Sequence, residues 1–131
     1  LHDDGCFKII RITWGSAFAA IAEFRQNDRC GQVATFRLSR GEMLIIPPGM
    51  GNSFQATDPV ETIYQYLVTT DTTPGKDVAT KRVNPLDQDL AIPWPIADHI
   101  ISDQDRALPS FAEVYPERYN EWKERQAALR S

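Results

Sequence analysis

The segment KIIRITWGSAFAAIAEFR, residues 8–25, carries the strongest indication of the fold class. Its first half is rich in β-branched residues and stops at Gly15, as a strand that meets a turn does. In its second half, alternation places Phe18 and Phe24 on one face of an extended strand. The alanines between them also suit a helix, and local propensity leaves both structures open. The short gap at Gly15 favours two strands joined as a hairpin.

Further strands follow at short spacing. QVATFRLS alternates at residues 32–39, and EMLIIPP at residues 42–48 is interpreted as a buried strand. ETIYQYLVTT at residues 61–70 places Tyr64 and Tyr66 on one side of another strand. Short strands separated by turn-rich segments are typical of a sandwich or a barrel. The sequence therefore predicts an all-β fold.

The stretch IIPPGMGNSF, residues 45–54, stops a strand abruptly. Pro47 and Pro48 fix φ and lack backbone donors, so the strand must end there, and the glycines after them allow a tight bend. Such a corner is either a structural turn or a loop that passes close to a ligand at the mouth of a barrel. The residues by themselves leave both interpretations open.

The last part of the chain, residues 110–131, is predicted to be helical. Ser110 and Glu113 form a capping box, and aromatic residues follow at helical spacing. We interpret this aromatic stripe as packing and not as a cofactor site. We expect one domain over residues 1–131, with a barrel and its loops at residues 1–109 and a C-terminal helix after them.

Composition and charge narrow the classes of function. The 131 residues carry a net charge of −4, which argues against nucleic acid as a partner. No apolar run approaches the roughly 20 residues of a membrane span, so we expect no membrane partner. The first residues, LHDDGCFKII, show no signal-peptide pattern and no initiator methionine, and we expect the natural chain to start upstream.

The cysteines and histidines show no pattern of a metal site. Cys6 and Cys30 lack CxxC spacing, and two free thiols in a cytoplasmic protein are favoured over the alternative of one disulfide. His2 and His99 lie far apart in the sequence, and no carboxylates cluster with either. The sequence therefore predicts no metal.

Five segments are similar, in order, to those of one known family. KIIRITWGSAFAAIAEFR, LIIPPGMGNSF, YQYLVTT, LAIPWP and IISDQDRALPSF resemble the dTDP-4-dehydrorhamnose 3,5-epimerase family, and we identify the chain as a divergent member. The resemblance runs from Leu1 to about Tyr115. It implies a cupin-type jelly-roll β-barrel with a C-terminal helical tail, a homodimer, and no metal or other cofactor. It also implies that the Pro-Gly turn lies at the sugar-binding mouth.

The resemblance implies a chemistry and three catalytic residues. The family abstracts a proton from a carbon next to the C4 ketone of a nucleotide-linked 6-deoxyhexose, which requires a base, a cation at the oxygen and an acid on the other ring face. His2, in the pair Leu-His, matches the base, and Asp105 matches the carboxylate that orients it. Asp103 lies two residues away and is easily confused with Asp105. Tyr66 matches the tyrosine that donates a proton on the far face.

Four further residues are expected to bind substrate. Lys8 matches the family lysine near the enolate oxygen, and Arg25 follows at the family's spacing, although a structural role there is the alternative. Tyr64 shares the strand face of Tyr66. Asn52 stands where the family usually has a histidine. Two other departures are Thr72 in place of a tyrosine and Ala19 in place of an aspartate.

These observations leave more than one function open. The first is 3-, 5- or 3,5-epimerisation of a dTDP-linked 4-keto-6-deoxyhexose in deoxysugar biosynthesis. The second is a non-catalytic or repurposed barrel that binds a sugar nucleotide, which the loss of the histidine at Asn52 favours. A keto-sugar isomerase on the same fold is the third.

Overall fold

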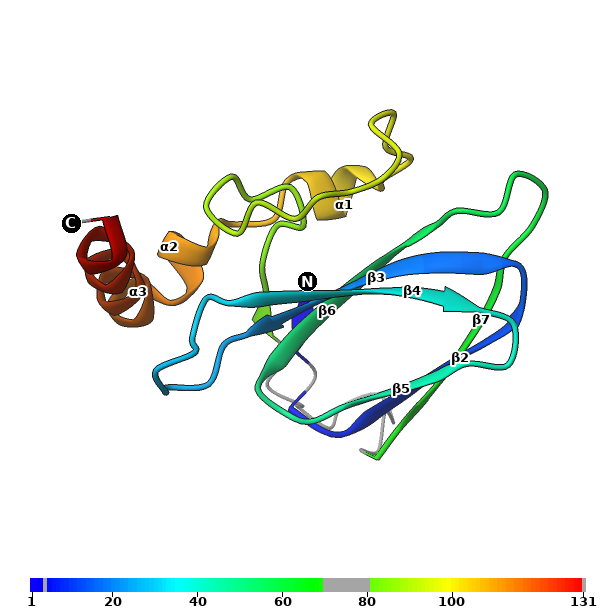
Figure 1. The fold of residues 1–131 in the computed structure, drawn as a ribbon, viewed down its shortest axis with the longest axis horizontal. Coiled ribbons are helices and arrows are strands. Elements are labelled where there is room, and N and C mark those ends of the chain that lie inside the picture. Colours follow the sequence, from blue (N-terminus) through cyan, green and yellow to red (C-terminus); the bar gives the residue numbers. More distant parts are fainter. Residues whose placement is uncertain (4, 70–80, 131) are drawn as a thin grey trace.

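Two antiparallel sheets face each other in the computed structural model, which describes residues 1–3, 5–69 and 81–130 (Figure 1). The all-β prediction is confirmed, and the arrangement is a jelly-roll barrel with its last two helices beyond one end of its strands. The larger sheet has the order β4 (Val33–Ser39), β3 (Ser16–Glu23), β6 (Met50–Ala56), β1 (His2–Asp3) and β8 (Lys81–Arg82). The smaller sheet has the order β5 (Met43–Ile46), β2 (Lys8–Trp14) and β7 (Ile63–Val68).

The expected hairpin at Gly15 is wrong. β2 pairs with β5 and β7, whereas β3 pairs with β4 and β6, so the chain changes sheets at this glycine. Gly15 has a φ of 75°, and a Cβ there would collide with the backbone of Glu61. A short connection fits a hairpin within one sheet and also a corner between two facing sheets. The spacing of strands in the sequence therefore does not tell these two connections apart.

The Pro-Gly turn is a second corner of this kind. It takes the chain from β5 in the smaller sheet to β6 in the larger one. The strand β6 was not expected, because its glycine-rich start has little strand propensity. Gly51 belongs there because the ring of Phe24 occupies the space of a Cβ. The prediction of a buried strand at EMLIIPP holds only in part, since Met43 and Ile45 of β5 are exposed.

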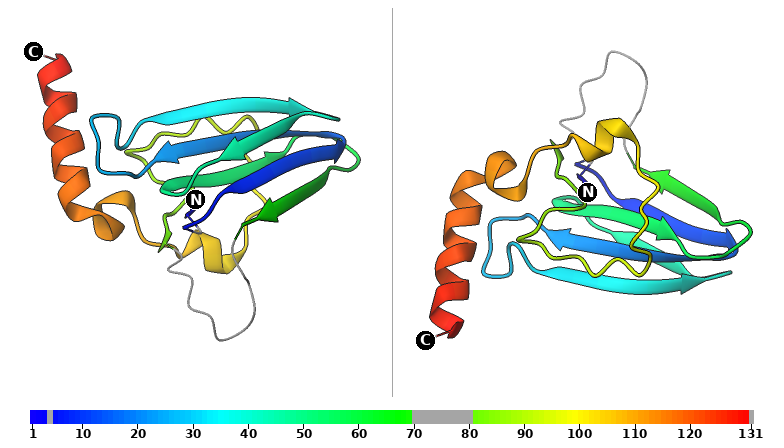
Figure 2. Two further views of the ribbon diagram at one scale, coloured as in Figure 1. Left: turned by 90° about the horizontal axis from the view of Figure 1, so that it is seen from below. Right: turned by 90° about the horizontal axis from the view of Figure 1, so that it is seen from above.

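The helical tail consists of two helices and not one. The capping box is present, because the Ser110 side chain accepts from the Glu113 amide and the Glu113 carboxylate accepts from the Ser110 amide. The first helix, α2 (Phe111–Val114), ends before Pro116, because a proline has no amide to continue it. A second helix, α3 (Pro116–Arg130), then runs across the ends of the strands (Figure 2).

Two clusters of buried side chains hold these parts together. One lies between the sheets and includes Ile10, Ile12, Ala19 and Leu38. The other joins the tail to the barrel through the aromatic stripe, with Phe111 fully buried at its centre. None of the described helices has the length and apolarity of a membrane span.

Candidate active site

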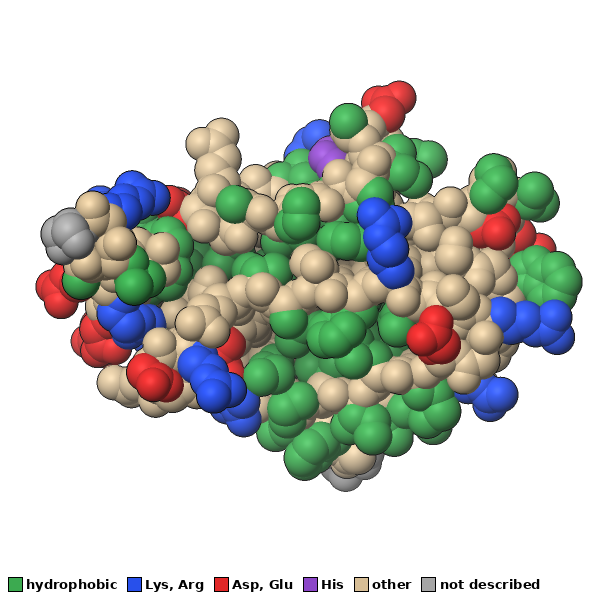
Figure 3. Space-filling view, in the orientation of Figure 1, with side chains coloured by type: hydrophobic (Ala, Val, Ile, Leu, Met, Phe, Trp, Pro, Cys, Tyr) green, Lys and Arg blue, Asp and Glu red, His purple; other side chains and the backbone are tan. Residues whose placement is uncertain are grey.

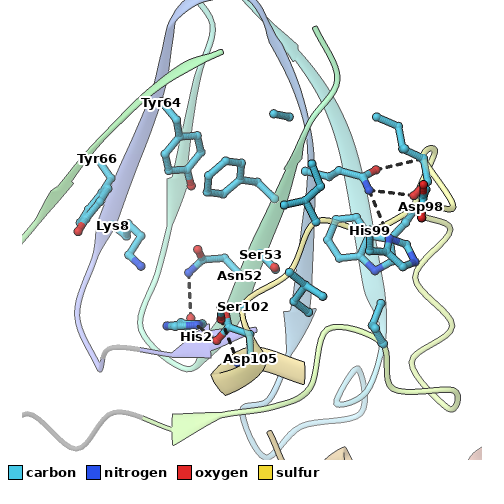
Figure 4. Close-up of a pocket in the computed structure, with 18 residues that line it drawn as sticks. His2, Lys8, Asn52, Ser53, Tyr64, Tyr66, Asp98, His99, Ser102 and Asp105 are labelled. Atoms are coloured by element: carbon cyan, nitrogen blue, oxygen red, sulfur yellow. Dashed lines mark hydrogen bonds and ion pairs between the residues drawn. The ribbon is translucent and has the colours of Figure 1, made fainter. Parts of the chain in front are cut away.

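A cavity of about 680 Å³ opens between β6 and β7 (Figure 4). Its remaining wall comes from the loop after residue 85 and from a one-turn helix, α1 (Asp103–Arg106). Six of the seven expected site residues line it: His2, Lys8, Asn52, Tyr64, Tyr66 and Asp105. The other lining residues are Ser53, Phe54, Gln55, Ala56, Leu86, Trp94, Ile96, Asp98, His99, Ile100, Ile101 and Ser102.

His2 and Asp105 meet at one end of the cavity. The His2 Nε2 and Asp105 Oδ1 atoms are 3.5 Å apart, and about a third of each side chain is exposed. His2 lies on β1, where it pairs with Asn52 of β6 and Arg82 of β8. Because β1 is only two residues long, its pairing on both sides is what holds the backbone of His2 in this place.

The helix α1 carries Asp105. The Ser102 hydroxyl accepts from the Asp105 amide at 3.1 Å and caps this helix. The Asn84 side chain donates to the Arg106 carbonyl at 3.0 Å and to the Leu108 carbonyl at 3.1 Å. These bonds hold the helix from its C-terminal side, so that Asp105 faces the cavity. Asp103 is exposed and does not line the cavity, which separates the two aspartates.

The opposite wall is aromatic and carries a cation. The Lys8 Nζ atom lies 5.5 Å from the centre of the Tyr66 ring. Tyr64 stacks on Phe54 with ring centres 3.7 Å apart and an interplanar angle of 8°. Burial first, and then the neighbouring Tyr66, raise the pKa of Tyr64 above its usual range, so this phenol stays protonated at neutral pH.

Asn52 holds β1, the strand that carries His2. Its Nδ2 atom donates to the His2 carbonyl at 2.9 Å, and the residue is 7% exposed. The amide therefore has a structural bond in addition to its place on the cavity wall. Ala19, the second departure from the family pattern, is buried in the core between the sheets. The third, Thr72, lies outside the described residues.

Arg25 does not reach this cavity. Its guanidinium donates to both carboxylate oxygens of Glu23, at 2.9 and 2.7 Å. Burial of Glu23 acts to raise its pKa, but the hydrogen bonds and charge of Arg25 outweigh burial and hold the pKa of Glu23 below its usual range. The structure therefore places Arg25 in an ion pair at the larger sheet, which matches the structural alternative.

The Pro-Gly turn also lies away from the cavity. The Gly49 amide donates to Asp3 Oδ1 at 3.1 Å, and the lining of the cavity on this strand begins at Asn52. The residues of the turn do not line the cavity, whereas Asn52, the residue after Gly51, does. The turn leads into β6, whose residues 52–56 all line the cavity.

Sequence reasoning missed the residues of the covering loop. Trp94, His99 and Ser102 line the cavity from a proline-rich stretch that has no strand or helix pattern. Gln55 was missed because β6 was missed. Among the described residues, no three His, Cys, Asp or Glu side chains gather as a metal site would require.

Comparison with known families agrees with this arrangement. The family model of dTDP-4-dehydrorhamnose 3,5-epimerase matches residues 1–113. The chain belongs to the dTDP-4-dehydrorhamnose 3,5-epimerase family. The resemblance of the five sequence segments is thereby confirmed. No curated protein sequence is similar enough to count as a match.

Solved structures show the same fold. RmlC from Streptococcus suis in complex with dTDP-D-xylose has a TM-score of 0.79 at 22% identity, covering 92% of this chain and 63% of that one. The dTDP-4-dehydrorhamnose 3,5-epimerase from Bacillus anthracis, with TDP and PPi bound, has a TM-score of 0.72 at 30% identity, covering 80% and 59%. ChmJ, a 3′-monoepimerase from Streptomyces bikiniensis in complex with dTDP-quinovose, has a TM-score of 0.72 at 26% identity, covering 95% and 65%. The chain thus spans less than two thirds of each of these proteins.

Proposed function

We propose that the protein epimerises a dTDP-linked 4-keto-6-deoxyhexose at C3, C5 or both. The observation that carries this proposal is the His2–Asp105 contact of 3.5 Å at the wall of a cavity that Lys8 and Tyr66 also line. The two residues are more than a hundred positions apart, and only the folded barrel brings them together. A base, a cation and a phenol around one cavity are the groups that enolate chemistry requires.

In this mechanism His2 removes the proton. Asp105 faces Nε2, so it favours the tautomer with hydrogen on that nitrogen and makes Nδ1 the basic one. Nδ1 accepts the proton from the carbon next to the ketone, and the bonding electrons move to the C4 oxygen. The charge that develops on the imidazole is stabilised by the carboxylate of Asp105.

Lys8 and Tyr66 complete the exchange. Lys8 lies beside Tyr66, on β2, which pairs with β7 in the same sheet, and its charge stabilises the enolate oxygen. Tyr66 then donates its phenolic proton to the opposite face of the carbon, which inverts the centre. The Tyr66 oxygen regains a proton from water, since this residue is 59% exposed.

The dTDP part of the substrate is inferred from similar proteins. The epimerase from Bacillus anthracis holds TDP, and ChmJ holds dTDP-quinovose. Among the described residues that line the cavity, Lys8 is the one lysine or arginine, and this mechanism assigns its charge to the enolate oxygen.

The test is solvent exchange. Incubation with a dTDP-4-keto-6-deoxyhexose in heavy water should place deuterium at C3, C5 or both, as read by NMR. Deuterium at one carbon defines a monoepimerase, and deuterium at both defines a 3,5-epimerase. Binding of the nucleotide sugar without deuterium at either carbon would reject catalysis and support the binding-module alternative.

We also propose a homodimer that covers the outer face of the smaller sheet. Ile45 and Leu67 flank Ile9 in register on this face and are 62% and 64% exposed. Figure 3 shows hydrophobic side chains along the lower edge of the molecule, where Figure 1 places β5. Such a surface, at the open edges of a sheet, favours pairing with a second copy.

Sedimentation at micromolar concentration tests the dimer. Ile45→Lys together with Leu67→Lys should yield monomers, whereas Val60→Lys, at a residue that is 90% exposed and lies outside the strands, should not. A wild-type monomer would contradict the proposal.

The free thiols Cys6 and Cys30 support a cytoplasmic location, which fractionation of cells would test.

A further inference from the structure

Residues 96–101 form a strap that crosses the cavity wall, and Gln55 of β6 fastens it. The Gln55 Nε2 atom donates to the Ile96 carbonyl at 2.9 Å, and the Ile96 amide donates to Gln55 Oε1 at 3.1 Å. Gln55 Nε2 also lies 3.4 Å from His99 Nδ1 (Figure 4). One side chain thus bonds the strap at two residues and uses its donor and its acceptor together.

These bonds are the attachment of the strap to the barrel. Within the described residues, Gln55 supplies every hydrogen bond that joins residues 96–101 to a strand of either sheet. The strap otherwise bonds within itself, as when the His99 amide donates to the Ala97 carbonyl at 3.1 Å. Ile96 is 40% exposed and Ile100 is fully exposed, so burial adds little to hold the strap.

The strap continues directly into the helix that carries Asp105. Ser102, the residue after the strap, is the cap of α1. Asn84 holds the C-terminal side of α1, and Gln55 holds the segment that enters its N-terminal side. Asp105 therefore lies between two attachments, that of Asn84 on one side and that of Gln55 on the other.

We propose that Gln55 is a positioning residue, which holds the strap so that Asp105 stays within reach of His2. The proposal rests on the proposed function for its effect on catalysis, but its structural part stands on the contacts of Gln55 alone. Gln55 is too far along β6 to take part in the His2–Asp105 contact itself, and it acts through the strap.

The chemistry of the amide explains why glutamine suits this place. The Ile96 pair fixes the orientation of the amide, so Nε2 faces the strap carbonyl and Oε1 faces the strap amide. Nε2 then presents its second hydrogen to His99, which accepts as the neutral imidazole with its own hydrogen on Nε2. A glutamate has no hydrogen for either acceptor, and a methionine of similar length makes none of the three bonds.

The first experiment needs no substrate. In Gln55→Met, the Ile96 amide should exchange with heavy water about tenfold faster, because it loses its acceptor. The chain has two histidines, so the imidazole signals of His2 are readily followed, and they should move towards those of Asp105→Asn. The control is Gln65→Met, since Gln65 is exposed on β7 and lies opposite Arg11 in register. It should change neither signal.

The second experiment uses catalysis in a double-mutant cycle. Gln55→Met should lower kcat for deuterium exchange about 10- to 100-fold with little change in KM. On the Asp105→Asn background the same substitution should cause no further loss, because its effect passes through Asp105. Gln55→Glu, which retains one acceptor, is a second variant with a milder change of volume, and it should show the same pattern.

Other outcomes overturn the proposal in separate ways. An unchanged Ile96 amide in Gln55→Met, the variant that loses the acceptor, rejects the strap attachment. Faster Ile96 exchange with unchanged His2 signals, or a loss of kcat that adds fully to that of Asp105→Asn, rejects the positioning role. If the wild-type protein itself exchanges no deuterium, the proposed function fails, while the Ile96 and His2 signals still decide whether Gln55 places Asp105.

Discussion

Two regions of this molecule each contain a cluster of phenylalanine and tyrosine rings, and the two clusters differ in what they do. At the helical tail, Phe24 stacks on Tyr115 with ring centres 5.0 Å apart, and Phe111 lies between them and α3. In the cavity, Phe54 stacks on Tyr64, and Tyr66 lies beside them. The first cluster joins helices to strands, and the second lines a space.

Exposure separates the two regions. Phe24 and Phe111 are 2% and 0% exposed, whereas Phe54 and Tyr66 are 41% and 59% exposed. Buried rings stabilise the fold through the apolar area that they remove from water. Half-exposed rings contribute less to folding and retain surface that a ligand can cover. Substitutions in the tail should therefore change stability, and those in the cavity should change activity.

The largest expected effect is on the catalytic pair. His2→Ala should lower deuterium exchange into the substrate by about 10⁴-fold, because the general base is lost. Asp105→Asn should lower it by a smaller factor, while Asp103→Asn, at the exposed neighbour, should leave it unchanged. NMR of the substrate in heavy water measures all three. Equal losses in both aspartate variants would contradict the assignment of Asp105.

The next largest effect is on stability. Phe111→Ala should lower the free energy of unfolding by about 3–5 kcal/mol, because it leaves a cavity in a fully buried cluster. Phe54→Ala, with its ring 41% exposed, should lower it by only about 1 kcal/mol. Urea denaturation of both variants measures the difference. Similar losses would show that exposure does not separate the two regions.

A smaller effect distinguishes the two halves of the reaction. Tyr66→Phe should slow formation of the inverted sugar by about 100-fold, because the donor on the far ring face is lost. Deuterium should still enter from the His2 side, with configuration retained. Tyr64→Phe is the matched control, since the Tyr64 ring has its own stacking partner. Loss of exchange in Tyr66→Phe would assign the abstraction step to this tyrosine.

The smallest expected effect concerns alkaline pH. Burial, followed by the charge of Asp3, raises the pKa of Tyr115 to about 12, against about 10 in an unfolded chain. Because the folded state favours the neutral phenol, Tyr115 contributes stability at any pH below its pKa in the unfolded chain. That contribution is lost as the pH rises to the pKa of the folded protein. Stability should therefore fall by about 1–2 kcal/mol between about pH 10 and pH 12. Urea denaturation of Tyr115→Phe, compared with wild type, should show a flatter decline; an identical decline would contradict the assignment.

Sequence reasoning succeeded where a signal is local. Alternation marked β3, β4 and β7, and the box of Ser110 and Glu113 marked the start of the tail, because these patterns depend on neighbours within a few residues. It failed at β6, where Gly51 lowers strand propensity because it makes room for Phe24, a residue 27 positions earlier. It failed again at Gly15, because β2 and β3 on either side of this glycine pair with strands of different sheets, and those partners lie far away in the sequence.

The sequence by itself determined the all-β class, the capped helical start, the family and six of the residues that line the cavity. Only the tertiary structure decided which residues meet. In it His2 contacts Asp105, Arg25 forms an ion pair with Glu23 outside the cavity, and Gln55 bonds to the strap. The physical reason is the range of the interactions. Propensity and alternation act over a few neighbours, whereas these contacts depend on how two sheets close on each other, and loop closure over long separations leaves no local pattern.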